Sequence, residues 1–520
     1  MPRERRASID EFLSNHDRAA AWVVTAIAIL VAASRAWQAR ESLWLDELHT
    51  AWAAGGALSQ VAHRSEIGNQ SPLFFWVEWF ITRFLGASEL TLRLPSIVAA
   101  TAMPVALFAT VRKWTGSPWL ALLPGWLYAV DPQAIYFGTE ARPYALIQLL
   151  AVLHVMVFAA AVERPSAGKR VTLVAGMAAL FYLNYTAVLL LGAEIVFWLV
   201  WRRGHRDASH NWNPFALDAG ALTLVSLGAL PTLREIAARR DNWASFVTQR
   251  PLWQGMLMAP WAWTAVALVV LVTAVRRFTP ATPANASRSR ALALTMAWLG
   301  VPVLIAWTAT ETDVARLLHP RYLAAAAPAA VVLIALAVSM VPWTRARIGI
   351  SMALVIVAPV LGRFPAELRS HGRLISYRED DWRAAIAAFN RTAGHERDPV
   401  LVRSLLIESD GLSAPPDSSL AAYCLYPVTS LYRLDADPNR LIALQRTNAV
   451  QLSAANARRV ILAPGFWMVL NASGDQADLI EDQFTRIGAS SVAPSAAGRW
   501  VVTKREVFGS VRVLRFDRAP

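Results

Sequence analysis

The sequence predicts a polytopic α-helical membrane protein with a soluble α/β domain at its C-terminal end. The composition, the recurring apolar segments and a change of pattern after Pro365 all indicate this class. Of the 520 residues, 55% are hydrophobic, 22 are Trp and 17% are charged. Charged residues make up about a quarter of an average soluble domain, so a polytopic membrane protein fits better. The length allows a membrane domain and one soluble domain.

Apolar segments of spanning length recur through residues 19–364, the predicted transmembrane domain. The first lacks a clear signal-peptide cleavage site, so we interpret it as a retained helix. The stretch 171–201 is too long for one helix, and we divide it near Asn184 into two, which gives about eleven spans in all. The other predicted spans cover residues 19–38, 92–111, 118–138, 142–162, 215–233, 258–275, 291–310, 321–341 and 347–363.

Basic side chains mark alternate ends of these segments. The positive-inside rule makes that side cytoplasmic, and it places residues 1–18 in the cytoplasm. The first outer loop, 39–91, is then large, and the chain after 364 lies outside. Residues 71–86 contain Glu78 and Arg83 and span only about 15 residues, so we expect a helix lying in the interface. The basic residues used here include Arg3, Arg5, Arg6, Arg18, Arg112, Lys113, Arg164, Lys169, Arg170, Arg202, Arg203, Arg276, Arg277, Arg288, Arg290, Arg345 and Arg347.

Residues 365–520 show mixed helix and strand patterns, which predict a small α/β domain. An amphipathic helix and a strand are expected after residue 377, with further strands at 457–465 and 507–516. No nucleotide-binding fingerprint occurs, and no cysteine or histidine motif of a metal site occurs. The net charge of +13 is explained by topology rather than by nucleic acid binding. With one cysteine, Cys424, no intrachain disulfide is possible.

An acidic pair, Asp46 and Glu47, follows the first predicted span beside Trp44. Adjacent side chains on a helix point about 100° apart, so both carboxylates cannot face one ligand squarely. A carboxylate beside Trp44 and the bilayer is partly desolvated, which favours a general base. An ordinary interfacial acid beside an aromatic-belt Trp gives the same pattern, and spacing alone leaves both interpretations open.

The second outer turn holds Glu140 and Arg142 ahead of Pro143. Ionisable residues at a membrane surface are candidates for function. A Glu–Arg ion pair that closes a tight turn is the alternative, and it explains the turn equally simply.

The last outer loop gathers Arg316, His319 and Arg321, which breaks the positive-inside pattern. The planar guanidinium of Arg suits a phosphate, so a lipid phosphate would explain the exception. Arginines that snorkel at a helix end are the alternative.

Two polar positions interrupt apolar stretches: Asn69, ahead of Pro72, and the Asn184–Tyr185 pair. Either could line a polar cavity or serve packing, and the sequence leaves both open.

Five stretches, in this order, resemble the GT-C membrane glycosyltransferases. The resemblance is to the bacterial branch of the protein-mannosyltransferase and aminoarabinose-transferase superfamily, glycosyltransferase family 39-like, and it covers nearly the whole chain. Two departures stand out: Gln70-Ser71-Pro72 replaces the usual His-Pro-Pro, and Asn184-Tyr185 replaces a common His-Tyr. The stretches are SLWLDELHTAWAA, SPLFFWVEWFITRFLGASELTLRLPS, IYFGTEARPYAL, HPRYLAAAAPA and EDDWRAAIAAF.

The resemblance implies an inverting glycosyltransferase of the bacterial inner membrane, acting on its periplasmic face. A polyprenyl-phosphate sugar is the implied donor, and a glycan, lipid or protein is the acceptor. Asp46 matches the family's catalytic acid and is expected to act as base, with Glu47 in support. The expected substrate- and phosphate-binding residues are Glu140, Arg142, Tyr144, His319, Arg321, Tyr322, Asn69, Asn184 and Tyr185.

No cofactor is indicated, although carboxylates at a phosphate site could recruit a divalent metal ion. A transporter or flippase of lipid-linked sugars is the competing class, and a non-catalytic scaffold is a third. Transporters usually bury charges at mid-membrane, whereas the ionisable clusters noted here fall at the outer ends of the apolar segments.

Overall fold

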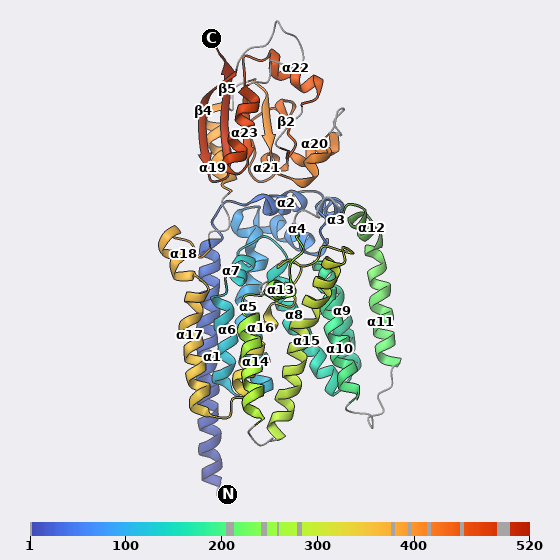
Figure 1. Cartoon of the computed structure of the whole chain (residues 1–520), viewed down its shortest axis with the longest axis vertical. Coiled ribbons are helices and arrows are strands. Elements are labelled where there is room, and N and C mark those ends of the chain that lie inside the picture. The colour runs from blue at the N-terminus through green and yellow to red at the C-terminus, as the bar shows by residue number, and fades with distance from the viewer. Residues whose placement is uncertain are drawn as a thin grey trace. The chain divides into compact units, whose positions relative to one another are not determined.

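The structure, a computed structural model, describes residues 3–203, 213–240, 247–256, 259–277, 283–375, 380–393, 397–412, 418–447, 452–485 and 500–519. The chain forms two compact units. The first, here the helical unit, comprises residues 1–39, 65–77 and 93–375. The second, the sheet unit, comprises residues 40–64, 78–92 and 376–520. Figure 1 labels the elements of both units.

The described helices include six that are long and apolar enough to cross a membrane. They are α1 (Arg3–Gln38), α5 (Glu89–Thr115), α8 (Tyr144–Glu163), the run of α11 (Asn213–Ser226), η2 (Leu227–Ala229) and α12 (Leu230–Ala238), α15 (Pro283–Glu311), and the run of α17 (Thr344–Leu361) and α18 (Phe364–His371). Shorter helices are α6 (Pro118–Ala129), α7 (Pro132–Gly138), α9 (Ala167–Leu183), η1 (Tyr185–Val188), α10 (Leu189–Arg203), α13 (Leu252–Met256), α14 (Ala262–Arg276) and α16 (Pro328–Ser339). The described residues of the predicted spans are mostly helical, and the prediction of a polytopic helical membrane protein is confirmed.

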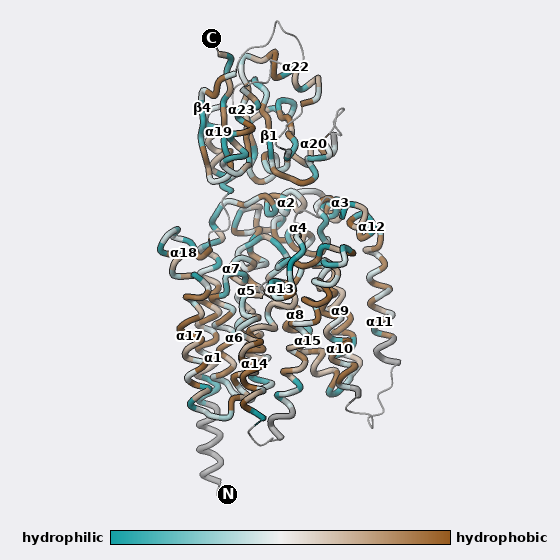
Figure 2. Tube along the Cα trace, viewed as in Figure 1, coloured by the Kyte–Doolittle hydropathy of each residue, from teal (hydrophilic) through white to brown (hydrophobic). Residues whose placement is uncertain are grey.

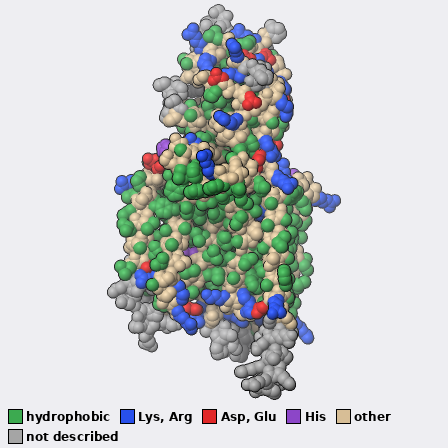
Figure 3. Space-filling view, turned by 180° about the vertical axis from the view of Figure 1, so that it is seen from behind, with side chains coloured by type: hydrophobic (Ala, Val, Ile, Leu, Met, Phe, Trp, Pro, Cys, Tyr) green, Lys and Arg blue, Asp and Glu red, His purple; other side chains and the backbone are tan. Residues whose placement is uncertain are grey.

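Helix α16 lies at the centre of the helical unit. All twelve of its residues are buried, and it packs against α14, α15, α6, α17 and α8. Outer helices instead expose large apolar side chains, such as Trp22 on α1 (76% exposed), Leu224 on α11 (70%) and Val360 on α17 (66%). Figure 3 shows a broad belt of hydrophobic side chains over the helices on the face it views, and Figure 2 shows many hydrophobic residues along the traces of these helices. A belt of this kind faces lipid rather than water.

Polar contacts inside the helical unit fix which helix ends lie together. At one end, Arg112 of α5 pairs with Asp17 of α1, Nη2 to Oδ1 3.0 Å. Arg288 at the start of α15 donates to the carbonyls of Thr115 (3.0 Å) and Ser339 (3.2 Å). These contacts bring the first part of α1, the end of α5, the start of α15 and the end of α16 together at one end of the helical unit.

The opposite end of the helical unit is closed by two buried contacts. Arg93 Nη1 donates to the carbonyl of Ala39 (2.9 Å), and the Leu374 amide donates to Gln38 Oε1 (2.8 Å). The chain thus leaves the helical unit at the end opposite to Asp17. An odd number of crossings would give this result, and the orientation of the chain in the membrane stays a prediction.

Two predicted spans have different boundaries in the structure. Residues 118–138 form α6 and α7, because Pro132 opens a new helix whose first turn is capped by Asp131, with Ala134 N donating to Oδ1 at 2.7 Å. The helix expected at 321–341 begins only at Pro328, and residues 320–327 form turns. A proline is favoured at the first helical position, so Pro328 sets the start of α16. The predicted interfacial helix is α4 (Leu73–Leu85), which has 13 residues and is not among the candidate spans.

The sheet unit contains a five-stranded mixed sheet in the order β2-β1-β3-β5-β4. The strands are β1 (Val400–Arg403), β2 (Leu441–Ala443), β3 (Gly465–Asn471), β4 (Trp500–Phe508) and β5 (Val511–Arg518). β1 is parallel to β2 and β3, whereas β5 is antiparallel to β3 and β4. Every residue of β3 is buried, as expected for a central strand covered on both faces.

The helices of the sheet unit include α2 (Leu45–Ala54), α3 (Leu58–Ile67), α19 (Trp382–Ala393), α20 (Ser418–Cys424), α21 (Tyr426–Thr429), α22 (Ala454–Leu462) and α23 (Gly474–Thr485), with short 3₁₀ turns η4 (Ile407–Gly411) and η5 (Pro438–Arg440). The expected amphipathic helix is α19, and the strand expected after it is β1. The stretch 507–516, expected as a strand, contains the end of β4, a turn and most of β5. The strand expected at 457–465 is wrong: this stretch is mostly α22, whose first turn is capped by Ser453. Its apolar run is short enough to fit either structure.

Candidate functional site

Arg321 is the centre of a buried polar cluster in the helical unit. Its Nη2 donates to Tyr136 Oη (3.4 Å) and lies 4.0 Å from Glu140 Oε1. The guanidinium carbon lies 6.0 Å from the centre of the Tyr144 ring. The Glu140 side chain is fully buried and that of Arg321 is 18% exposed. Burial strengthens the electrostatic effect of this cation, and its remaining exposed surface can meet an anionic ligand.

The loop that carries Arg321 is held by its own side chains and by η1. The backbone amide of Arg321 donates to His319 Nδ1 (3.3 Å), and the His319 ring lies 5.6 Å from that of Tyr322. Thr186 Oγ1 donates to the Tyr322 carbonyl (3.2 Å) and to Asn184 Oδ1 (2.8 Å). Four of the predicted residues therefore belong to one connected set, and Asn184 acts in it as the cap of η1.

Asn69 and Tyr185 lie at the edge of this set. The Tyr185 amide donates to Ser71 Oγ at 3.2 Å, which ties η1 to the turn that follows Asn69. Asn69 has a left-handed backbone, with φ of 56°, a conformation that asparagine tolerates better than most residues. The polar residues that interrupt the apolar stretches are thus turn-forming residues beside the Arg321 cluster.

Arg142 is 3% exposed and fixed through its backbone. Its carbonyl accepts a hydrogen bond from Ser96 Oγ (2.9 Å), and its amide donates to the Glu140 carbonyl (2.8 Å). The Arg321 side chain is 18% exposed. Of the two arginines, Arg321 therefore has more surface with which to face a ligand.

The acidic pair belongs to the sheet unit, at the start of α2. Glu47 is fully buried, and its Oε2 accepts a hydrogen bond from the amide of Trp44 (3.3 Å), which caps the helix. Asp46 is only half-buried. The two carboxylates therefore have different surroundings, and the partly exposed Asp46 in the first turn benefits from the helix dipole.

Three tyrosines from the C-terminal part of the sheet unit hold α2, and sequence reasoning did not identify them. Tyr426 Oη donates to the Leu45 carbonyl (3.0 Å), and the Leu43 amide donates to Tyr432 Oη (2.9 Å). The rings of Tyr423 and Tyr426 lie 6.0 and 5.7 Å from that of His49 on α2. Aromatic spacing in the C-terminal part of the sequence gave no signal of this contact.

Glu78 of α4 is a second buried acid in the sheet unit. Its side chain is fully buried, and neither carboxylate oxygen has a hydrogen-bond partner among the described residues. Burial, and then the nearby charge of Glu47, raise the pKa of Glu78 well above its ordinary value. Both effects favour the protonated form of the Glu78 carboxyl. Over the part of the chain that the structure describes, no group of three or more His, Cys, Asp or Glu side chains could hold a metal ion.

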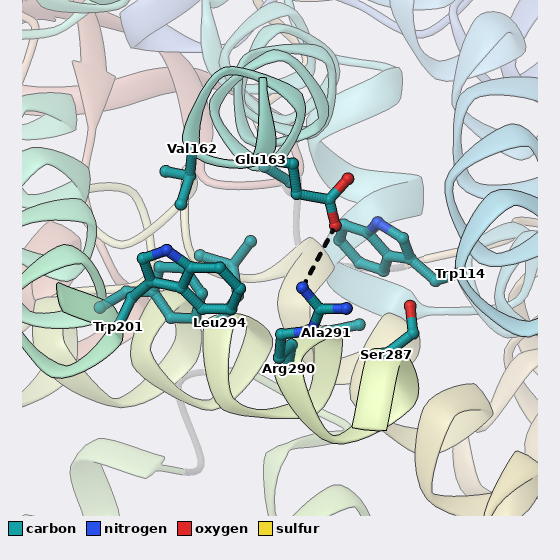
Figure 4. Close-up of a pocket in the computed structure, with 10 residues that line it drawn as sticks. Trp114, Val162, Glu163, Trp201, Ser287, Arg290, Ala291 and Leu294 are labelled. Atoms are coloured by element: carbon teal, nitrogen blue, oxygen red, sulfur yellow. Dashed lines mark ion pairs between the residues drawn. The ribbon is translucent and has the colours of Figure 1, made fainter. Parts of the chain in front are cut away.

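A pocket elsewhere in the helical unit is lined by Trp114, Trp201 and Ser287 among others (Figure 4). Arg290 lies over the Trp201 ring at 5.0 Å and 3.9 Å from Glu163. These residues come from the helix ends opposite to those around Arg321, so the pocket is separate from the candidate site.

Comparison with known proteins assigns the fold. Residues 69–228 match the family described as dolichyl-phosphate-mannose-protein mannosyltransferase. The crystal structure of ArnT from Cupriavidus metallidurans bound to undecaprenyl phosphate aligns with 96% of this chain and 98% of that chain, with a TM-score of 0.56 and 12% identity. This chain has the GT-C membrane fold. The apo form of the same ArnT aligns with a TM-score of 0.43 at 11% identity over the same shares. No curated protein matches the chain.

The GT-C helical unit also contains a buried ionisable pair that sequence reasoning missed. His154 Nε2 lies 2.7 Å from Glu194 Oε1, and the two side chains are 2% and 9% exposed. His154 is near the middle of α8, and Glu194 is in the second turn of α10. Each residue is a single polar position within a long apolar run, and only the packing of the two helices pairs them. This pair lies within the helices, unlike the ionisable clusters noted from the sequence, which fall at the outer ends of the apolar segments.

Proposed function

We propose that this protein is an inverting glycosyltransferase that moves a monosaccharide from a polyprenyl-phosphate donor to an acceptor hydroxyl. The observation that carries the proposal is the Arg321 cluster in a GT-C fold that aligns over nearly the whole chain. The aligned ArnT structure is bound to undecaprenyl phosphate, which supports a polyprenyl phosphate as the carrier. The matched mannosyltransferase family supports a lipid-phosphate sugar as donor.

In the proposed reaction the acceptor oxygen attacks the anomeric carbon from the face opposite to the phosphate. The new carbon–oxygen bond forms as the sugar–phosphate bond breaks, so the configuration inverts. Asp46 takes the proton of the acceptor hydroxyl, and the polyprenyl phosphate leaves with both electrons of the broken bond. A phosphate leaves without protonation, so no general acid is needed.

Arg321 is the residue that we assign to the leaving phosphate. Its guanidinium is pre-positioned by Tyr136, Glu140 and Tyr144. A fixed cation that meets charge as it develops lowers the barrier by about 3–4 kcal/mol in comparable sites. Glu140 keeps the cation in place, and Glu47 supports Asp46 indirectly, by capping the helix that carries it.

The setting of the reaction is the periplasmic face of a bacterial inner membrane. The apolar belt supports a multi-pass membrane protein, and the basic helix ends support a cytoplasmic location for the end that contains Asp17 and Arg112. On that orientation the Arg321 end and the C-terminal sheet are periplasmic. The transferred sugar is a hexose or a pentose, and the acceptor is a glycan, a lipid or a protein.

The test is transfer by the purified protein in liposomes. Synthetic polyprenyl-phosphate sugars are supplied with candidate acceptors, and released polyprenyl phosphate is measured. Asp46→Asn should abolish release, whereas Asp313→Asn, at an exposed acid 69% accessible in its side chain, should leave it unchanged. Full activity of Asp46→Asn would refute the assignment of the base.

Transport of lipid-linked sugars is the second candidate, and the His154–Glu194 pair favours it, because buried ionisable pairs within spans mark transport pathways in many membrane proteins. The same liposomes distinguish the two functions. Movement of the labelled donor between leaflets without release of polyprenyl phosphate would support transport and contradict transfer.

A further inference from the structure

The His154–Glu194 contact joins two helices that otherwise pack on different partners. Helix α8 packs chiefly against α9, and α10 packs chiefly against α15. Besides the 2.7 Å contact between His154 and Glu194, the rings of Phe158 and Phe197 meet at 6.1 Å one turn further along the same faces. The polar pair is therefore the main directional link between α8 and α10.

The two side chains meet inside the apolar part of the helical unit. Isolated polar groups are costly at membrane depth, and the contact of 2.7 Å between His154 Nε2 and Glu194 Oε1 places each group beside an ionisable partner. Because the side chains are only 2% and 9% exposed, the packing around this contact limits the orientation of both. Helix α9 closes the third side, since a Cβ at Gly176 would lie 2.9 Å from His154 Nδ1.

Both linked helices begin at the Arg321 cluster. Tyr144, the first residue of α8, lies under the Arg321 guanidinium, and His154 is about 15 Å further along the helix. Helix α10 follows η1 directly, and Thr186 of η1 donates to the carbonyl of Tyr322 at 3.2 Å. A shift of α8 against α10 would therefore change the contacts on the two residues at the centre of the cluster.

We propose that His154 and Glu194 are positioning residues for the phosphate-binding cluster. Their contact holds α8 and α10 in register, so that Tyr144 and η1 keep Arg321 and Tyr322 in place. This role rests on the proposed function only in the identity of the ligand that the cluster binds.

The first test measures the cluster without any ligand. Hydrogen–deuterium exchange is compared between wild-type protein and Glu194→Leu in detergent. We expect at least tenfold faster exchange at residues 184–188 and 321–323, with unchanged exchange in α17. The matched controls are Leu153→Ala and Ile195→Ala, neighbours on the same helices that are 43% and 49% exposed, and they should behave as wild type.

Two further variants keep the test decisive if Glu194→Leu does not fold. Glu194→Gln can still donate an amide N–H to His154 and should restore wild-type exchange. Gly176→Ala keeps both His154 and Glu194 in the sequence but puts a methyl group against His154 Nδ1. This variant should accelerate exchange at residues 184–188. Unchanged exchange at both segments in Gly176→Ala or in folded Glu194→Leu overturns the proposal.

The second test measures the consequence for the ligand. Binding of undecaprenyl phosphate should weaken at least fivefold in Glu194→Leu and return to the wild-type level in Glu194→Gln. In the transfer assay the same change should lower kcat/KM for the donor at least fivefold, because Arg321 is displaced from the leaving phosphate, and Glu194→Gln should restore it. Failure of wild-type protein to bind undecaprenyl phosphate would contradict the proposed function, whereas the exchange experiment would still decide the positioning role.

Discussion

Replacement of Arg321 by alanine should lower both the stability of the protein and the rate of transfer. The change removes a cation that lies 4.0 Å from the fully buried Glu140 carboxylate. At an effective dielectric constant of about 20, two unit charges at this distance attract by about 4 kcal/mol. Because Arg321 is still 18% exposed, we expect Arg321→Ala to lower the free energy of unfolding by about 2–4 kcal/mol. Loss of the phosphate cation should also reduce transfer by about 10²–10³-fold.

Glu140→Gln in the same chain tests the reasoning. The double variant Arg321→Ala/Glu140→Gln removes the buried carboxylate charge together with the Arg321 cation, so thermal unfolding in detergent should return most of the way to wild type. Transfer should remain as low as in Arg321→Ala, because the phosphate cation is still missing. Arg316→Ala on the same loop is the matched control, since its partner Asp313 is exposed and such pairs contribute about 0–1 kcal/mol. Recovery of transfer in the double variant, or no recovery of stability, would refute this account.

Three further predictions concern the sheet unit. Burial and the charge of Glu47 raise the pKa of Glu78. Its contribution to stability is therefore fully present below the unfolded pKa of about 4.3 and is lost as pH rises through the folded pKa. Glu78→Gln should raise the melting temperature at pH 8 and not at pH 4, and equal effects at both pH values would contradict this prediction. Tyr432→Phe should cost about 1–3 kcal/mol in thermal unfolding, because its hydroxyl bridges the Leu43 amide and Glu89 at 2.9 Å each; an unchanged melting temperature would show that the bridge is not stabilising. Burial raises the pKa of Cys424 to about 12. Maleimide should therefore label this thiol at pH 7.5 only after denaturation, as measured by mass spectrometry. Rapid labelling of the native protein would disprove the burial of Cys424.

Prediction from sequence succeeded where the signal is local. Apolar length located the spans, and the sequence pattern located strand structure at 507–516, although not the turn between β4 and β5. Prediction from sequence failed where residues outside a stretch decide whether that stretch forms a helix or a strand. The run at 457–465 is equally compatible with strand and helix until Ser453 caps α22, and the start of α16 depends on Pro328.

The candidate site shows the same division. Sequence motifs selected Glu140, Arg142 and Arg321, but the ion pair of Glu140 with Arg321 joins residues far apart in the chain. The cap formed by Glu47 is local and could have been predicted from its place three residues after Trp44. The partners of α2, such as Tyr426 and Tyr432, could not, because nothing in the local pattern indicates which distant ring meets a helix.

The sequence by itself determined that the chain is a polytopic membrane protein with alternating basic helix ends, because hydropathy and charge act through bilayer thickness and need no tertiary information. It also singled out the polar residues at the outer turns. Only the tertiary structure decided which of them meet, that Glu47 and Glu78 are buried while Asp46 is half-exposed, and that His154 pairs with Glu194. The physical reason is that burial and ion pairing depend on which helices pack together, and the faces of two apolar helices are not distinguished by their hydropathy alone.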